Sequence, residues 1–246
     1  MRLTKCGAVL IAILALGAMF SAAAFAKKSE TMKSQWYING KALAVGTVKS
    51  IECKLGEHEG LRTSLTTTVG KVNLKLTATG VSCPGGQLEE FEPAAGTKHA
   101  GGSATSIKFT GVTVDEPENC STNAVLETEP LNAYVEMEEG STEKAFIKFQ
   151  PKNAGELFIK IPITGATCSI ANPEYEIKGT VYGEAVNKTG VASTEQPVTF
   201  SKEIQETASG VTGGTLTFGG KPAFLTGRAI FFNVNGANES FSAKES

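Results

Sequence analysis

Apolar and polar residues alternate along most of this chain, and this period of two constrains the fold more than any other feature. The clearest runs are Val72–Ala78, Leu131–Met137, Leu157–Ile163 and Tyr175–Val181. Successive side chains of a β-strand point to opposite faces of a sheet, so alternation places one face on a core and the other in water. Because no segment has a convincing helical period, the sequence predicts an all-β protein.

Turn residues separate the predicted strands at short intervals. Asn39-Gly40 and Gly219-Gly220 each lie between two apolar runs and supply the positive φ angles that a tight hairpin needs. We expect about eleven to thirteen short strands in an antiparallel β-sandwich or barrel-like fold. Residues 27–246 are predicted to form a single all-β domain.

Two segments, Pro84–Ser103 and Asn187–Pro197, are predicted to be long loops, and the second is a candidate sub-domain boundary.

The first 26 residues have the layout of a secretory signal peptide. Arg2 and Lys5 form a positive head, an apolar run follows, and Ala24-Phe25-Ala26 precedes Lys27. This pattern predicts an N-terminal signal helix that is cleaved between Ala26 and Lys27. The apolar run of roughly 13 residues is shorter than the about 20 that a membrane-spanning helix needs. We therefore expect an exported protein, secreted or associated with the cell envelope, with no membrane span after cleavage.

Four cysteines remain after the predicted cleavage site: Cys53, Cys83, Cys120 and Cys168. An even number in an exported protein indicates two disulfides, and four cysteines allow three connectivities. We favour Cys83–Cys120 with Cys53–Cys168, because strands that are neighbours in sequence usually pair and bring their end loops together. The more local pairing, Cys53–Cys83 with Cys120–Cys168, stays open.

The charge balance and the residue composition argue against nucleic-acid partners and against metal cofactors. The chain has 23 Lys and Arg against 25 Asp and Glu, a formal net charge of −2, and only Arg62 and Arg228 are arginines outside the predicted signal. No basic surface for nucleic acid is expected from such a composition. Asp115 is the single aspartate, and there is no C-x-x-C pair. We expect no metal site and no cofactor.

The stretch Ile107–Cys120 combines a predicted strand, a Thr-Gly turn and a cysteine, and Leu126–Leu131 follows it with a Thr-x-Pro-Leu strand. These segments resemble a group of uncharacterised exported β-rich proteins of high-GC soil actinobacteria. The closing segment Gly220–Gly227 is similar to the C-terminal regions of those proteins. The resemblance covers about half of the predicted mature chain. It implies an extracytoplasmic location and a β-rich fold, and no known activity.

Paired carboxylates are the first candidates for chemistry, since exported β-proteins that hydrolyse sugars use two acidic residues. Glu174 and Glu176 face the same side of one predicted strand, and Glu136 and Glu138 do so on another. The same spacing arises on any strand face that is exposed to water. We interpret both pairs as solvated surface.

Aromatic and histidine side chains are the remaining candidates. Trp36 and Tyr37, beside a hairpin turn, are the best candidates for stacking on a ligand, and Trp36 is also a typical core anchor. His58 and His99 are the only histidines, and both lie in glycine-bounded segments that we predict to be surface. The chain contains no G-x-S-x-G or phosphate-binding motif.

These observations favour a non-enzymatic, disulfide-containing β-protein that acts as a binding or structural module at the cell envelope or outside the cell. Its ligand would be a cell-wall or other extracellular molecule. The alternative is a secreted hydrolase that acts on polysaccharide with two glutamates. A cleft that brings two glutamates within about 5 to 10 Å would favour the hydrolase, whereas glutamates dispersed over open strand faces would favour the binding module.

Overall fold

The computed structural model describes residues 34–55, 62–94, 97–137, 144–153, 157–206, 216–236 and 238–245. The described part of the chain is all-β, with 65% of these residues in strands and 3% in helix, and its one helical turn covers residues 202–206. The predicted fold class is thereby confirmed. The signal peptide, its cleavage site and His58 lie outside the described residues.

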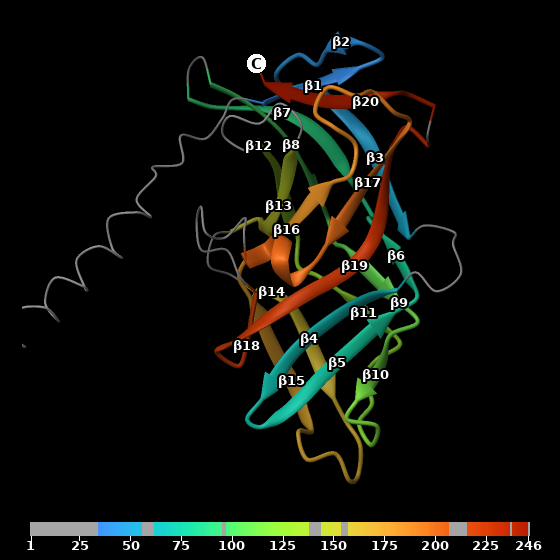
Figure 1. Ribbon diagram of the computed structural model, residues 1–246, viewed down its shortest axis with the longest axis vertical. Helices are drawn as coiled ribbons and strands as arrows, with labels where there is room; N and C mark the ends of the chain where they lie inside the picture. The colour runs from blue at the N-terminus through green and yellow to red at the C-terminus, as the bar shows by residue number, and fades with distance from the viewer. Residues whose placement is uncertain are drawn as a thin grey trace, which may run out of the picture.

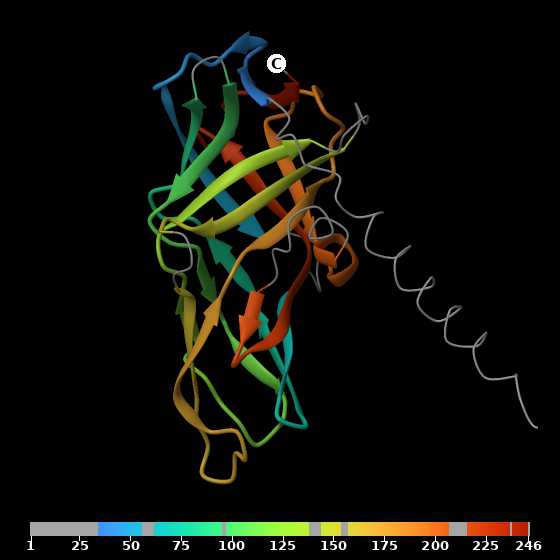
Figure 2. The same ribbon diagram turned by 90° about the vertical axis from the view of Figure 1, so that its left-hand side faces the viewer.

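Eight strands close into an antiparallel barrel at one end of the molecule (Figures 1 and 2). Each strand pairs with the next, and the last pairs with the first. In order around the ring they are β3 (Val48–Leu55), β7 (Gln87–Ala94), β8 (Thr97–Ala104), β12 (Leu131–Met137), β13 (Ala145–Pro151), β16 (Val181–Ala185), β17 (Glu195–Phe200) and β19 (Lys221–Val234).

The other end of the molecule is a second antiparallel sheet that shares β19 with the barrel. Its order is β10 (Thr113–Glu116), β5 (Val72–Ala78), β4 (Thr63–Val69), β19, β18 (Leu216–Phe218), β15 (Asn172–Lys178) and β14 (Leu157–Ile163). A three-stranded sheet lies beside it, in the order β11 (Val125–Glu127), β9 (Lys108–Thr110) and β6 (Gly80–Ser82). An isolated bridge between Thr128 and Ile159 joins this small sheet to β14.

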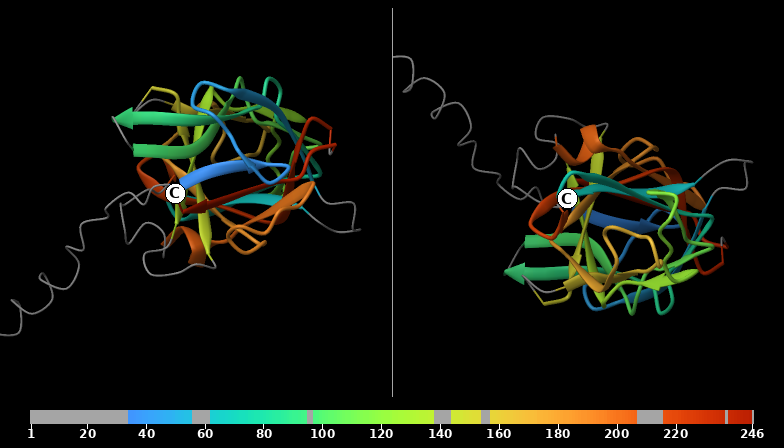
Figure 3. Two further views of the ribbon diagram at one scale, coloured as in Figure 1. Left: turned by 90° about the horizontal axis from the view of Figure 1, so that it is seen from above. Right: turned by 90° about the horizontal axis from the view of Figure 1, so that it is seen from below.

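A separate three-stranded sheet covers the open end of the barrel, and we call it the lid sheet. It consists of β2 (Lys41–Ala42), β1 (Ser34–Ile38) and β20 (Phe241–Glu245). Seen from above, β1 and β20 run together across the ring of barrel strands (Figure 3). The described residues contain 20 strands, more than the eleven to thirteen that we expected. Strands of only two to four residues are too short to show a readable alternation, so the sequence did not predict them.

The protein has two apolar cores, one toward each end of the molecule. The larger core fills the second sheet and the lower part of the barrel, with Leu74, Phe158, Ile177 and Phe218 almost fully buried. The smaller core lies under the lid sheet and includes Trp36, Leu88, Val135 and Phe241. Phe232 of β19 packs against both cores.

The segment Pro84–Ser103, predicted to be a loop, is mostly the hairpin of β7 and β8. Its glycines are placed where the neighbouring strands come close. A Cβ on Gly102 would lie 2.2 Å from the carbonyl oxygen of Gln87, and one on Gly101 would lie 2.4 Å from that of Ala133. Glycine is needed here for close strand approach, so the loop prediction for Pro84–Ser103 is wrong.

The favoured disulfide pairing is also wrong, and the more local alternative is the one observed. Cys53 bonds to Cys83, with Cα atoms 5.3 Å apart, and Cys120 bonds to Cys168, with Cα atoms 4.9 Å apart. After β6 the chain runs toward the barrel, where the backbone N–H of Ile51 on β3 donates to the Gly86 carbonyl. This contact brings Cys83 beside β3, which carries Cys53. The pairing of neighbouring strands, on which we relied, does not place Cys83 beside Cys120.

Non-reducing peptide mapping of the purified protein tests this connectivity. We expect one peptide pair that contains Cys53 and Cys83 and another that contains Cys120 and Cys168. The bridges close separations of 30 and 48 residues. In the chain-entropy approximation, removing either bridge by a double Cys→Ala change lowers the free energy of unfolding by about 3.5 to 4 kcal/mol. A peptide that links Cys83 to Cys120 would contradict the fold described above.

Candidate functional site

The most distinctive feature of the barrel is an apolar cavity of about 100 Å³ in its interior. Strands from all around the ring contribute to its wall, and the lid sheet contributes Trp36, Phe241 and Ala243. The side chains of Ile147, Phe149 and Phe232 supply much of the apolar wall. Cavities of this order are known to stay dry and to take up a benzene-sized molecule.

Small side chains at inward-facing positions create this space. Alternation places every second residue of a barrel strand inside the ring. On β8 the lining residues include Gly102 and Ala104, on β12 Ala133, on β13 Ala145, and on β16 Ala185. Register puts Ala133 directly opposite Gly102 on one side and Phe149 on the other. The closed ring of hydrogen bonds fixes the diameter, so these short side chains leave a void.

Trp36 of β1 anchors the lid sheet over the cavity. Its indole Nε1–H donates to the Gly101 carbonyl at 2.9 Å, and its backbone N–H donates to Glu90 Oε2 at 2.9 Å. Its ring lies 6.1 Å from that of Phe241, between centroids. Ser34 adds a bond on each side, since its hydroxyl donates to the Val135 carbonyl and accepts from the Ala100 N–H. The lid sheet is thus bonded to β7, β8 and β12.

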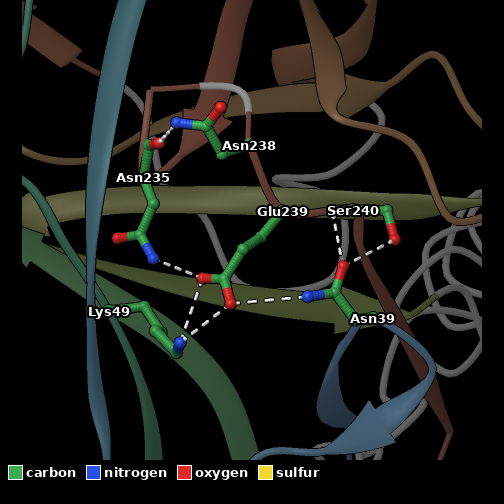
Figure 4. A network of polar contacts seen from close by, with 6 residues as sticks. All are labelled: Asn39, Lys49, Asn235, Asn238, Glu239 and Ser240. Carbon is green, nitrogen blue, oxygen red and sulfur yellow. Dashed lines mark hydrogen bonds and ion pairs between the residues drawn. The ribbon is translucent and has the colours of Figure 1, made fainter.

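A polar network fixes the outer edge of the lid sheet (Figure 4). Both carboxylate oxygens of Glu239 lie 3.0 Å from Lys49 Nζ on β3. The same carboxylate accepts from the side-chain amides of Asn39 and Asn235. Asn39 in turn accepts from the backbone N–H of Ser240 at 3.0 Å. The turn after β1 and the turn after β19 are therefore tied to the barrel wall through one glutamate.

The connection between β16 and β17 forms one side of the cavity, and we call residues 186–191 the mouth segment. Asn187, Lys188, Thr189 and Val191 all line the cavity. Because Lys188 and Val191 are also exposed, the cavity reaches the surface at this segment. All of the mouth segment except Val186 belongs to the predicted loop Asn187–Pro197. What the sequence analysis missed is the cavity itself.

Of the two aromatic candidates, one reaches the cavity. Trp36 is 8% exposed and lines the wall, so it is both a core anchor and a candidate ligand contact. Tyr37 points the other way and is half-buried, with Lys244 Nζ 4.0 Å from the centre of its ring. His99 lies on β8 opposite Phe91 and does not line the cavity.

The three paired glutamates that the structure describes, Glu136, Glu174 and Glu176, do not converge on a cleft. Glu174 and Glu176 are exposed on β15 in the second sheet, where Glu174 pairs with Lys160 and Glu176 with Lys178. The hydrogen bond from Lys178 lowers the pKa of Glu176, whereas a general acid needs a raised one. Glu136, on β12, lies 3.6 Å from Lys148 and is absent from the described cavity wall. Its partner Glu138 lies outside the described residues.

Comparisons with known proteins found no relative for this chain. A scan against protein-family models, a search of curated proteins and a search of solved structures each returned no match.

Within the described ranges, no helix is long and apolar enough to cross a membrane. The same ranges contain no group of three His, Cys, Asp or Glu residues placed to hold a metal ion.

Changing Glu239 to Gln tests whether the network holds the lid sheet. Loss of the charge weakens the bonds from Lys49 and from the two amides, so we expect the free energy of unfolding to fall by about 1 to 2 kcal/mol. Amide hydrogen exchange should accelerate in β1 and β20. The matched control is Glu206→Gln, which removes an exposed pair with Lys202 and should change stability by less than about 0.5 kcal/mol. Equal effects of the two changes would show that the network does not hold the lid sheet.

Proposed function

We propose that this chain is an exported binding protein that holds a small apolar group inside its barrel. The observation that carries the proposal is the apolar cavity enclosed by the eight strands and the lid sheet. Small-molecule sites are concave and mostly apolar, with a few polar groups, and an eight-stranded barrel is wide enough to hold one small ligand. Glu136, Glu174 and Glu176 are dispersed and paired with lysines, which supports binding rather than hydrolysis.

The expected location outside the cytoplasm rests on the predicted signal peptide and on the resemblance to exported actinobacterial proteins. The two disulfides are compatible with that location, because such bonds persist in oxidising compartments. A ligand for this cavity would be of about the size of one aromatic ring or a short alkyl chain. Larger molecules would insert only an apolar end.

Toluene is a suitable first probe, because it is apolar, uncharged and of the right size. A ligand that binds only the folded state, present at ten times its dissociation constant, raises the free energy of unfolding by about 1.4 kcal/mol. For a domain of this size we expect the melting temperature to rise by about 3 to 6 °C. Differential scanning calorimetry with and without toluene measures the shift.

Filling the cavity should abolish this effect. Ala133→Phe places a ring in the void from β12, and Ala185→Leu fills it from β16 if the first variant does not fold. Ala171→Phe makes the same change at an exposed position outside the cavity wall and should keep the full toluene shift. No shift in the unmodified protein, or an equal shift in the filled variants, would refute the proposed function.

A further inference from the structure

Two smaller apolar cavities follow the barrel cavity toward the other end of the molecule. We call the barrel cavity the upper cavity, and the other two the middle and the lower cavity. The middle cavity has a volume of about 10 Å³ and the lower cavity about 50 Å³. Strands of the second sheet line the lower cavity, with Leu76 of β5, Ile161 of β14 and Ile177 of β15 on its wall.

Shared side chains show that the three cavities lie in a row. The upper and middle cavities are both lined by Cys83, Ile107, Phe149 and Phe232. The middle and lower cavities are both lined by Phe109, Phe158 and Leu225. A layer of side chains therefore separates each cavity from the next. The row runs from the lid sheet into the second sheet, along the long axis of the molecule (Figure 1).

The partitions between the cavities consist of side chains. Between the upper and middle cavities, the ring centroids of Phe149 and Phe232 lie 6.1 Å apart, with an angle of 20° between the ring planes. Such side chains can change rotamer without breaking the hydrogen bonds between barrel strands. The backbone around them is fixed, because the Cys53–Cys83 disulfide on the wall of the middle cavity ties β3 to the residues after β6. Side-chain movement alone can thus join the cavities.

Apolar contact dominates along the whole row. The described wall of the middle cavity is apolar, and that of the lower cavity is apolar apart from Thr63 and Thr77. At the mouth segment, Asn187 Nδ2–H donates to Gln196 Oε1 at 2.7 Å, and Gln196 Nε2–H donates to the Phe241 carbonyl at 2.6 Å. Both amides are already bonded within the protein. The shape of an apolar ligand therefore matters more than its polar groups.

The middle cavity sets the width of any ligand that reaches the lower cavity. Its volume of about 10 Å³ corresponds to about one water-sized sphere. An aromatic ring or a branched group is too wide for this space, whereas an extended alkyl chain is only one methylene group wide. A ligand that fills both larger cavities must therefore be unbranched.

We propose that the ligand is a single-chain amphiphile whose unbranched alkyl chain passes from the upper cavity through the middle cavity into the lower one. This inference rests on the proposed binding function and names the chemical class of the ligand. The chain leaves water along its whole length, whereas its polar end stays hydrated at the mouth segment. Affinity then increases with chain length beyond what the upper cavity alone can hold.

The test measures dissociation constants for 1-butanol, 1-hexanol, 1-octanol and 1-decanol. Trp36 is the only tryptophan of the chain and lines the upper cavity, so its fluorescence reports binding. Each methylene group that moves from water into an apolar site tightens binding by up to about four-fold. We expect 1-decanol to bind about 10- to 100-fold more tightly than 1-hexanol. A chain confined to the upper cavity would gain little beyond 1-hexanol.

Filling the lower cavity should remove this gain. Ala78 of β5 is 5% exposed and lines the lower cavity. In Ala78→Leu we expect 1-decanol to bind at least about ten-fold more weakly than in the unmodified protein, and 1-hexanol to bind both equally. If Ala78→Leu does not fold, Val112→Leu narrows the same cavity from the β9–β10 connection and should weaken 1-decanol by about three-fold. The matched control is Ala171→Leu, at an exposed position outside all three cavity walls, which should change neither affinity.

A second comparison tests the shape of the ligand. 1-Adamantanol has as many carbon atoms as 1-decanol, but in a compact cage that cannot enter the middle cavity. We expect 1-adamantanol to bind at least about ten-fold more weakly than 1-decanol, because most of its apolar surface stays outside the row of cavities. Ala78→Leu should leave its affinity unchanged.

The outcomes separate this inference from the proposed function. An affinity that increases up to 1-decanol, and that Ala78→Leu reduces, supports the inference. Affinity that levels off at 1-hexanol overturns it, as does equal binding of 1-decanol by Ala78→Leu, or 1-adamantanol that binds as tightly as 1-decanol. In each of these cases, binding of toluene and 1-hexanol would still support the proposed function. If neither toluene nor any of the alcohols binds, the proposed function and the inference fail together.

Discussion

Strand β19 is the element on which the rest of the structure depends, because it belongs to both ends of the molecule. Its first residues pair with β18 and β4, and its later residues pair with β17 and β3. The change of partner occurs at Gly227, which is paired with Thr63 of β4 and Phe200 of β17. A Cβ at Gly227 would lie 3.0 Å from the Thr63 hydroxyl. The pairing of β19 with β3 closes the barrel, and closure leaves the ring without open edges.

Closure also explains why an apolar cavity persists in this barrel. An open sheet with small side chains on its inner face can bend until the space is filled, whereas a hydrogen-bonded ring cannot shrink without breaking its ladder. Small residues such as Gly102, Ala133 and Ala185 therefore leave room that large neighbours such as Phe149 do not fill. The lid sheet completes the enclosure through the bonds of Trp36 and Ser34 to the barrel. The same residues that weaken packing in the smaller core thus form the candidate site.

The arrangement of polar side chains agrees with a binding site that is entered from one end of the barrel. The network around Glu239 fixes the lid sheet, and the bonds of Gln196 fix the mouth segment, so two different polar groups hold the two sides of the same enclosure. Glu136, Glu174 and Glu176, which were weighed as catalytic candidates, lie elsewhere, on strand faces where lysines neutralise them. The spacing of Glu174 and Glu176 by two along β15 places them on the same face without enclosing any space between them.

The sequence by itself determined the fold class and most of the longer strands, because alternation along one strand is a local property that sheet formation preserves. It also placed both tight hairpin turns, Asn39-Gly40 and Gly219-Gly220, where positive φ angles occur. The sequence did not reveal that Thr97–Ala104 is a strand, because its glycines are explained only by the strands on either side. The disulfide pairs, the β19–β3 closure and the cavity were decided by tertiary structure alone. Each depends on which distant segments meet, and contacts of that kind leave no periodic trace in a single sequence.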